Sequence, residues 1–240
     1  MKSTVDEIRE RFDHEVERFS NLETGQAATM DARLCMELVA QAAACVTPHA
    51  RDLLDVGCGA GNYTLMMLRQ IPRLNCTLVD LSLPMLEKAR ERVTAAGAGT
   101  IETMQGDMRE AALGEERFDV VVSAATLHHL RTDAEWRAMF EKVYRALRPG
   151  GSFWVFDLIE HATPELQNMM WARYGEFLVN IKGGGAAGQN YRDAVFAYVA
   201  KEDTPRSLLF QTALMHAAGF TGVDVLHKNG PFAAFGGVKR

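Results

Sequence analysis

Residues 53–61 read Leu53-Leu54-Asp55-Val56-Gly57-Cys58-Gly59-Ala60-Gly61, an apolar strand that runs directly into a turn with three glycines. Glycine accepts positive φ and leaves room for a ligand beside the backbone. The spacing Gly57-x-Gly59-x-Gly61 differs from the Gly-x-Gly-x-x-Gly pattern of dinucleotide sites, and it lacks the Lys-Ser/Thr ending of a phosphate loop. We therefore expect a ligand site of another kind here. The alternative is a turn that merely joins a strand to a helix tightly.

Strand and helix patterns alternate around this turn. The expected strands span 52–56, 76–80, 100–104, 118–123 and 152–159, and the expected helices between them span 60–71, 84–96 and 133–147. This alternation predicts an α/β fold, in which helices cover both faces of a mostly parallel sheet. Beyond residue 160 we expect helices over 164–180, 189–200 and 205–218, and a flexible glycine-rich run over 183–188. Two strands over 222–227 and 232–238 then flank Asn229-Gly230, a hairpin-turn pair.

The N-terminal segment is predicted to be helical. Thr4-x-x-Glu7 fits a capping box, and apolar residues recur at helical spacing from Val5 to Phe19. A second helix is expected over 30–46, closed by Pro48.

Composition argues against several classes of protein. The chain has 240 residues, 48% of them hydrophobic, and a formal net charge of -5, so no global positive field indicates DNA as a partner. The N-terminus lacks the apolar core of a signal peptide, and no apolar run is long enough to span a membrane. We therefore expect a cytoplasmic protein. We expect no metal site, because the cysteines are scattered and adjacent side chains such as those of His128 and His129 point apart on a helix or strand.

Three aspartates lie at the end of, or just after, three of the predicted strands. Asp55 precedes the glycines and is placed to face an ammonium group. Asp80 lies 80 − 61 = 19 residues after the last glycine, a position suited to ribose hydroxyls. Asp107 can accept from an adenine amino group, and Met85 and Met108 can pack on its ring faces. The alternatives are a helix cap for Asp80, a turn residue for Asp107, and plain core positions for both methionines.

The ordered motifs resemble those of class I S-adenosylmethionine-dependent methyltransferases. The similar segments are Leu53 to Gly61, Val79-Asp80-Leu81-Ser82 with Pro84-Met85-Leu86, Gly106-Asp107-Met108, Phe118 to Ser123 with Leu127-His128-His129-Leu130, and Leu147-Arg148-Pro149-Gly150-Gly151. The resemblance implies a Rossmann-like sheet of seven strands with the last antiparallel, and S-adenosyl-L-methionine as cofactor. The cofactor-binding residues that we predict are Asp55, Gly57, Cys58, Gly59, Gly61, Asp80, Leu81, Met85, Gly106, Asp107, Met108, Ser123, Ala124 and His129.

On this basis we expect one domain over residues 1–240. It divides into a helical cap over 1–49, a cofactor-binding core over 50–160, a helical substrate insertion over 161–220 and a C-terminal hairpin over 221–240. A homodimer formed through the N-terminal helices is a further hypothesis.

The expected reaction is methyl transfer to a small-molecule acceptor by in-line displacement, which requires positioning and exclusion of water. The chain has Ser123-Ala124-Ala125-Thr126 where methyltransferases that act on DNA bases or protein glutamine typically have Asn/Asp-Pro-Pro-Tyr/Phe. His128 is the candidate base, or else a residue that shapes its loop. The candidate substrate-binding residues are Trp171, Tyr174, Tyr191 and Arg192. Alternatively, the first two form an aromatic core contact and the last two a solvated helix start.

Two other functions stay open at this point. The tail from Gly219 to Gly237 is loosely similar to that of the carboxy-S-adenosylmethionine synthases, which modify the same cofactor. A non-catalytic protein that binds S-adenosylmethionine is the other alternative, and the intact motif set argues against it.

Overall fold

The computed structural model describes residues 2–21 and 25–240. Its strands form a seven-stranded sheet in the order β3-β2-β1-β4-β5-β7-β6. The bounds are β1 Asp52–Val56, β2 Asn75–Asp80, β3 Ile101–Gln105, β4 Phe118–Ala124, β5 Leu147–Leu158, β6 Thr221–Asn229 and β7 Phe232–Val238. Strands β1 to β5 pair in parallel, and β7 is antiparallel to both of its neighbours. The expected Rossmann-like sheet is thus confirmed.

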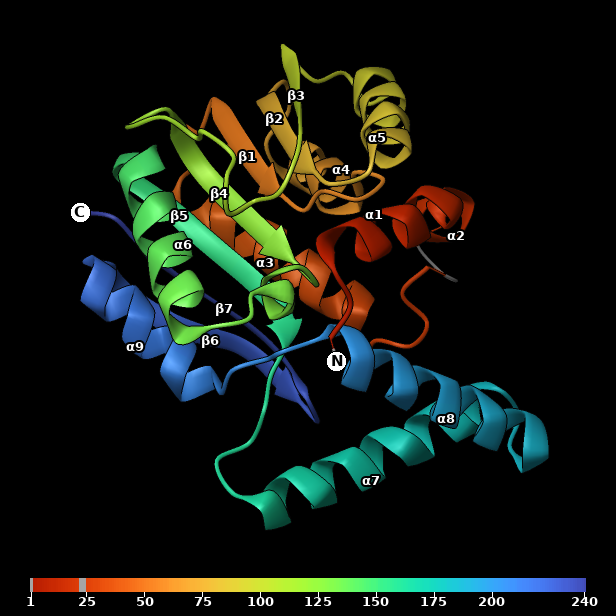
Figure 1. Cartoon of the computed structure of the whole chain (residues 1–240). Coiled ribbons are helices and arrows are strands. Elements are labelled where there is room, and N and C mark those ends of the chain that lie inside the picture. Colours follow the sequence, from red (N-terminus) through yellow and green to blue (C-terminus); the bar gives the residue numbers. More distant parts are fainter. Residues whose placement is uncertain (1, 22–24) are drawn as a thin grey trace.

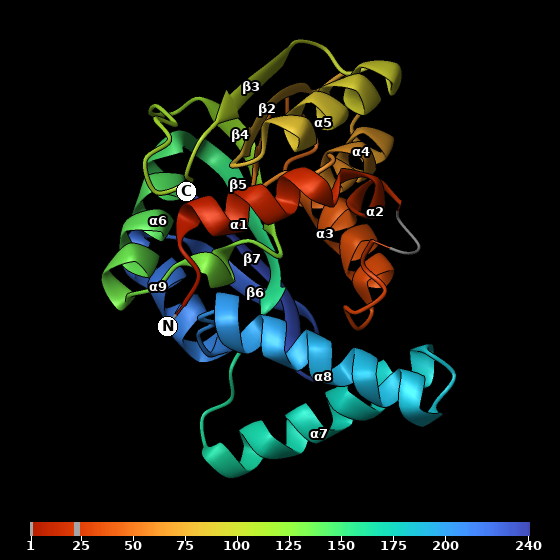
Figure 2. The same cartoon turned by 45° about the vertical axis from the view of Figure 1, so that its right-hand side comes forward.

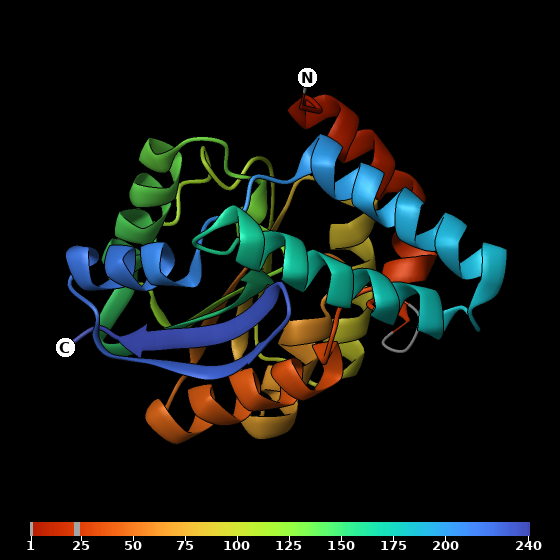
Figure 3. The same ribbon diagram turned by 90° about the horizontal axis from the view of Figure 1, so that it is seen from below.

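Helices cover both faces of this sheet (Figures 1 and 3). Helices α3 (Ala32–Val46), α4 (Asn62–Gln70) and α5 (Leu83–Ala95) contribute to one core, and α6 (Asp133–Ala146) and α9 (Leu208–Ala218) to the other. Successive strand side chains point to opposite faces, so Leu53 belongs to the first core and Leu54 to the second. The inner strands such as β1 are therefore buried on both sides, as a parallel sheet covered by helices requires.

The N-terminal helix begins as predicted but ends earlier. Thr4 and Glu7 form the capping box of α1 (Val5–His14), which confirms that expectation. At Glu15 the backbone N–H bonds to the carbonyl of Phe12, three residues back, and the chain turns into the short helix α2 (Val16–Ser20). Helix α1 crosses the end of the sheet toward which the β1, β4 and β5 arrows point (Figures 1 and 2).

Helices α7 (Pro164–Ile181) and α8 (Gly185–Glu202) form a hairpin beside the sheet (Figure 1). The prediction of a flexible run over 183–188 is wrong beyond Gly184, because α8 already begins at Gly185. A Cβ at Gly188 would lie 2.5 Å from the carbonyl oxygen of Val179 on α7. The small residues at this end of α8 therefore let the two helices approach closely instead of forming a loop.

The C-terminal end of α8 lies beside the N-terminal segment. The Ser3 N–H donates to the carbonyl of Lys201 (3.1 Å), and the Thr204 N–H donates to the carbonyl of His128 (2.7 Å). Segments that are far apart in the sequence thus meet at one end of the sheet. Within the described part of the chain, none of the helices combines the length and the apolar character needed to cross a membrane.

Candidate functional site

A cavity of about 270 Å³ lies where the ends of β1, β2 and β4 and the turn after β3 meet helix α1. Ligands of open α/β sheets bind at this edge, outside the carboxyl ends of the strands. Twelve of the fourteen predicted cofactor-binding residues line the cavity: Asp55, Gly57, Cys58, Gly59, Asp80, Leu81, Met85, Gly106, Asp107, Met108, Ala124 and His129.

The glycine turn is held against β2 and leaves space on its other side. The N–H groups of Gly57 and Cys58 both donate to the carbonyl of Val79, at 2.8 and 3.0 Å. Gly57, with φ of 72°, has no room for a side chain, because a Cβ there would lie 2.2 Å from Thr126 Oγ1. Gly59, with φ of 50°, has no atom within 4 Å of its Cβ position. The backbone is therefore open to a ligand at Gly59.

Asp55 is buried with one oxygen unpartnered. Thr64 Oγ1 donates to its Oδ2 at 2.6 Å, whereas Oδ1 has no hydrogen-bond partner among the described residues. Burial raises the pKa of Asp55 to about 7, and the charge of Asp80 adds to this effect while the Thr64 bond opposes it. A cationic donor in the cavity would satisfy this carboxylate.

Asp80 links the glycine turn to the start of α5. Its Oδ2 accepts from the Gly59 N–H at 2.7 Å, and its Oδ1 accepts from the Ser82 N–H at 2.9 Å. Burial raises the pKa of this carboxyl group above its ordinary value, and the backbone N–H groups partly offset the shift. These bonds fix the carboxylate at the cavity wall, where further lone pairs remain for ligand hydroxyls.

Asp107 is bound to a neighbour that the sequence reading missed. Its two oxygens accept from the guanidinium of Arg109, which also contacts Glu135 at 3.0 Å. Burial acts to raise the pKa of Asp107, but the bonds and charge of Arg109 outweigh burial and lower it. Much of its accepting capacity is therefore already used, which weakens the predicted role toward an adenine amino group. Met85 and Met108 both line the cavity.

His128 lies behind the cavity wall, between two carboxylates. Its Nδ1 is hydrogen-bonded to Asp157 Oδ1, and its Nε2 is 3.6 Å from Asp203 Oδ1. Burial lowers the pKa of His128, but the charges of Asp157 and Asp203 outweigh it and raise the pKa to about 9. The structure argues against the predicted base, since this imidazole does not line the cavity.

His129 lines the cavity and packs edge-on against Phe12, with ring centroids 6.1 Å apart. Burial lowers its pKa well below the ordinary value, and the nearby positive charge of His128 adds to this.

The expectation that the adjacent His128 and His129 rings point apart is wrong: their centroids are 4.5 Å apart. Both residues lie in the short 3₁₀ helix η1 (Leu127–His129), whose tighter turn departs from α-helix and strand geometry.

Besides His128, six predicted site residues lie away from the cavity lining. Gly61 packs against Ala89, and Ser123 Oγ donates to the carbonyl of Val56. The aromatic rings of α7 pack within the hairpin: Trp171 lies edge-on to Phe196 (4.8 Å), and Tyr174 Oη donates to the carbonyl of Ala28. Lys182 lies over Tyr191, and Arg192 pairs with Asp193. For Trp171 and Tyr174 the core alternative is therefore the better description.

The N-terminal segment, expected to form a helical cap, forms the roof of the cavity, although its individual lining residues were not predicted. Residues of the N-terminal segment line it, among them Ser3, Ile8, Phe12 and Phe19, and so does Arg131. The apolar spacing from Val5 to Phe19 indicated a helix with a buried face, but a periodic pattern does not say what that face covers.

Comparison with known proteins agrees with this geometry. Residues 53–151 match the family model described as a methyltransferase domain. Over these residues the chain therefore has a methyltransferase domain. The domain contains the glycine turn, Asp80, Asp107 and the histidine pair, whereas the α7–α8 hairpin and the segment that covers the cavity lie outside the matched residues.

The relatives match mainly over this domain. The chain is 34% identical over 119 residues to an uncharacterized methyltransferase of Mycobacterium tuberculosis, covering 50% of this chain and 55% of the relative. It is 37% identical over 109 residues to the carboxy-S-adenosyl-L-methionine synthase of Vibrio cholerae, covering 44% of this chain and 43% of that enzyme. The chain thus spans about half the length of these two curated relatives.

A solved structure of an O-methyltransferase family protein from Burkholderia thailandensis has a TM-score of 0.64 with this chain. The match covers 95% of this chain and 61% of that protein at 19% identity, and it supports the fold. The cofactor of the methyltransferase domain is S-adenosyl-L-methionine, and the unpartnered oxygen of Asp55 and the open backbone at Gly59 fit such a ligand.

Proposed function

We propose that the chain transfers the methyl group of S-adenosyl-L-methionine to a small-molecule acceptor. The observation that carries this proposal is a single cavity that brings together Asp55 Oδ1, the carboxylate of Asp80 and the open glycine turn at Gly59. When bound, the cofactor supplies a methyl group activated on a sulfonium. Asp55 would receive its ammonium group, Asp80 its ribose hydroxyls, and Met85 and Met108 would flank its adenine.

The remaining contribution of the protein is enclosure. Ile8, Phe12 and Phe19 place apolar side chains over the cavity, so a bound reactant is shielded from water. Exclusion of water and fixed orientation are the main requirements of an in-line displacement from an activated donor. A cavity of about 270 Å³ beneath a helix favours a small acceptor over a macromolecular one.

Calorimetry with S-adenosyl-L-methionine tests the cofactor site. Asp80→Asn keeps the shape of the side chain but removes its charge, and we expect it to weaken binding about 10- to 100-fold, the usual range for hydrogen bonds to a charged group. Asp224→Asn is the matched control, because Asp224 is exposed on β6, away from the cavity lining. Absence of binding at millimolar cofactor would overturn the proposal, and equal affinity in both variants would refute the role of Asp80.

A screen for S-adenosylhomocysteine release over a metabolite panel tests the transfer itself. Acidic metabolites belong in that panel, because Arg131 lines the cavity with a positive charge. Its guanidinium donates to neutral oxygens, the carbonyls of Glu202 and Ser3 and Thr204 Oγ1. Among the described residues, no carboxylate forms an ion pair with it. We expect Arg131→Gln to raise KM for an anionic acceptor while cofactor affinity changes little.

The positive charge of Arg131 also supports a second candidate function. In this alternative, the enzyme modifies the cofactor as the carboxy-S-adenosyl-L-methionine synthases do. The 37% identity to the Vibrio cholerae synthase motivates it. Incubation of the protein with S-adenosyl-L-methionine and a carboxyl donor, followed by mass spectrometry of the nucleoside, separates the two functions. A carboxylated sulfonium favours the synthase, whereas S-adenosylhomocysteine with a methylated acceptor favours methyl transfer.

A further inference from the structure

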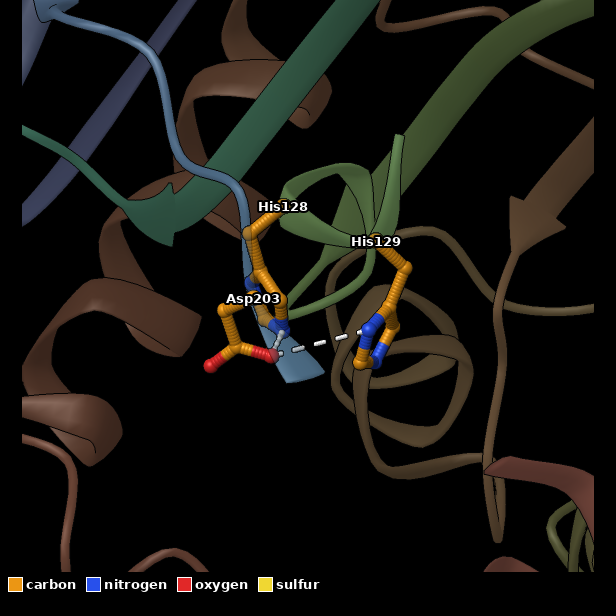
Figure 4. Close-up of side chains that lie close together, drawn as sticks. All are labelled: His128, His129 and Asp203. Atoms are coloured by element: carbon orange, nitrogen blue, oxygen red, sulfur yellow. Dashed lines mark ion pairs between the residues drawn. The ribbon is translucent and has the colours of Figure 1, made fainter. Parts of the chain in front are cut away.

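Three side chains from distant parts of the sequence converge beside the cavity. His128 and His129 come from η1, and Asp203 directly follows α8 (Figure 4). One ligand atom from each lies within 4.8 Å of the other two. His128 Nε2 and His129 Nδ1 are each 3.6 Å from Asp203 Oδ1. These separations are too long for hydrogen bonds, so the three groups face one another without satisfying one another.

The cluster is buried, and three of its polar atoms lack hydrogen-bond partners among the described residues. The side chain of Asp203 is 3% exposed, and its Oδ1 has no hydrogen-bond partner among the described residues. Within the same described part, both ring nitrogens of His129 are also buried and unpartnered. Unsatisfied polar atoms in the interior are costly, and several that face one point indicate a missing ligand.

Nearby cations are engaged elsewhere. Arg11 pairs with Glu202 at 2.6 Å, and Arg131 donates to the Glu202 carbonyl and to Thr204 Oγ1 at 3.0 Å. Neither guanidinium reaches the carboxylate of Asp203 in the described part of the chain. Arg11 acts on the Asp203 carboxylate without forming an ion pair with it, and the two imidazoles are the nearest groups that can neutralise its charge.

His128 is oriented as histidine ligands usually are. Its Nδ1 is bound to the buried carboxylate of Asp157, which also accepts from the backbone N–H groups of His128 (3.2 Å) and Leu158 (2.7 Å). A carboxylate on one ring nitrogen fixes the ring and its tautomer, and directs the lone pair of the other nitrogen at the metal. Here that other nitrogen, Nε2, faces Asp203 Oδ1.

We propose that His128, His129 and Asp203 bind a divalent transition-metal ion of the zinc class at the wall of the cavity. Ligand atoms about 2.0–2.2 Å from a tetrahedral ion lie about 3.3 Å apart, close to the two separations to Asp203 Oδ1. Two histidines and one carboxylate with an open fourth position form the ligand set of catalytic sites. Because His129 lines the cavity, the open position adjoins bound reactants.

The ion has a consequence for the reaction, which rests on the function proposed above. A metal-bound acceptor hydroxyl loses its proton more readily, because the ion stabilises the resulting oxyanion. The proton can then pass to a solvent water molecule before the methyl group is transferred, and the resulting oxyanion is the nucleophile. Metal binding itself is independent of methyl transfer, and it is measured without cofactor.

Cobalt titration of the chelator-treated full chain tests the site. We expect visible d–d absorption that saturates at one Co²⁺ per chain and is abolished by one equivalent of Zn²⁺. Absence of saturable absorption in the wild-type protein would overturn the proposal, with no need for a variant. The titration contains no cofactor, so observed Co²⁺ binding supports the metal site even if no methyl acceptor is found. Absence of Co²⁺ binding would contradict the metal site but not the proposed methyl transfer.

Variants then locate the ion. We expect Asp203→Asn and His129→Gln to weaken Co²⁺ binding at least about 100-fold, and Asp157→Asn about 10- to 100-fold, the range for loss of a carboxylate behind a histidine ligand. His216→Gln, which changes an exposed histidine on α9, is the control and should bind as the wild type does. Unchanged affinity in folded Asp203→Asn, judged by circular dichroism, would contradict this site.

Discussion

Asp55 and Asp80 are two buried carboxylates at one cavity, and the burial of each raises its pKa. A buried carboxylate with an unpartnered oxygen is unfavourable in the free protein, yet it is well placed to receive a cation. A positively charged ligand reverses the effect, because it stabilises the ionised form. At the scale of single residues, the free protein is thus prepared electrostatically for a cationic cofactor.

This arrangement predicts proton-linked binding. The pKa of Asp55 is about 7 in the free protein, and a bound ammonium group would lower it. Cofactor affinity should therefore be fully present above pH 7 and fall as pH decreases below it, by up to about tenfold per pH unit. Calorimetry in two buffers of different ionisation enthalpy measures the proton released near neutral pH. Asp55→Asn should abolish that release, and a pH-independent affinity in the wild type would contradict the role of Asp55.

Individual residues also show where sequence reasoning stops. Asp55, Asp80 and the glycines were predictable, because their positions follow from the ends of strands. The partners of Asp107 and His128 were not. Asp157 sits within an apolar strand, and that buried acid was a signal that strand patterns alone do not interpret. Asp203 approaches His128 only through the packing of α8, a contact that leaves no local sequence pattern.

At the scale of elements, α1 is a short helix that covers the cavity and depends on its first turn. The Glu7 N–H donates to Thr4 Oγ1 at 3.2 Å, and Glu7 Oε2 accepts from the Thr4 N–H at 2.8 Å. Helix α7 provides a comparison, because Thr163 caps it by accepting from the Leu166 N–H. Thr163 is exposed and does not line the cavity.

Removal of either cap should destabilise its helix by about 1 kcal/mol. We expect Thr4→Ala to raise the Kd for S-adenosyl-L-methionine about fivefold, since α1 must form to enclose the ligand, and Thr163→Ala to leave Kd unchanged. Titration calorimetry measures the affinities, and amide exchange in α1 and α7 verifies that each cap was lost. Equal effects of the two variants on Kd would show that α1 does not cover the bound cofactor.

The elements were largely predictable, and their contacts were not. Strand and helix periods placed the sheet strands within a few residues of their observed bounds, apart from β5, which begins at Leu147 because that residue pairs with Phe118 before the chain reaches Ser152. Periodicity predicts which face of a helix is buried, but it does not predict which element packs against that face. Two parallel strands can pair only after the chain has crossed over between them, so the packing partners of each element depend on the whole chain. For the same reason, the α7–α8 contact at Gly188 was missed.

At the scale of the whole molecule, the N-terminal segment and the end of α8 form one unit over the cavity. Besides the Ser3 bond to Lys201, Arg11 on α1 pairs with Glu202, whose side chain is 6% exposed. The junction anchors the helix whose side chains cover the cavity. Its strength therefore governs how easily the site opens.

Glu202→Gln should loosen the junction by about 2 kcal/mol, the usual worth of a hydrogen bond between charged groups out of solvent. We expect faster amide exchange in α1 and faster cofactor dissociation. Glu37→Gln is the matched control, because the Arg33–Glu37 pair is exposed and its loss should cost less than about 0.5 kcal/mol. Exchange in α1 that is as slow in Glu202→Gln as in the control would show that other contacts hold the segment.

Cys58, in the middle of the glycine turn, makes the occupancy of the cavity readable by chemistry. It is buried at the cavity lining and burial raises its pKa, whereas Cys45 is exposed. A thiol reagent should therefore label Cys45 at once and Cys58 only when the cavity opens to solvent. The delay between the labelling of Cys45 and that of Cys58 therefore measures how often the cavity opens. A ligand that fills the cavity should prevent the labelling of Cys58.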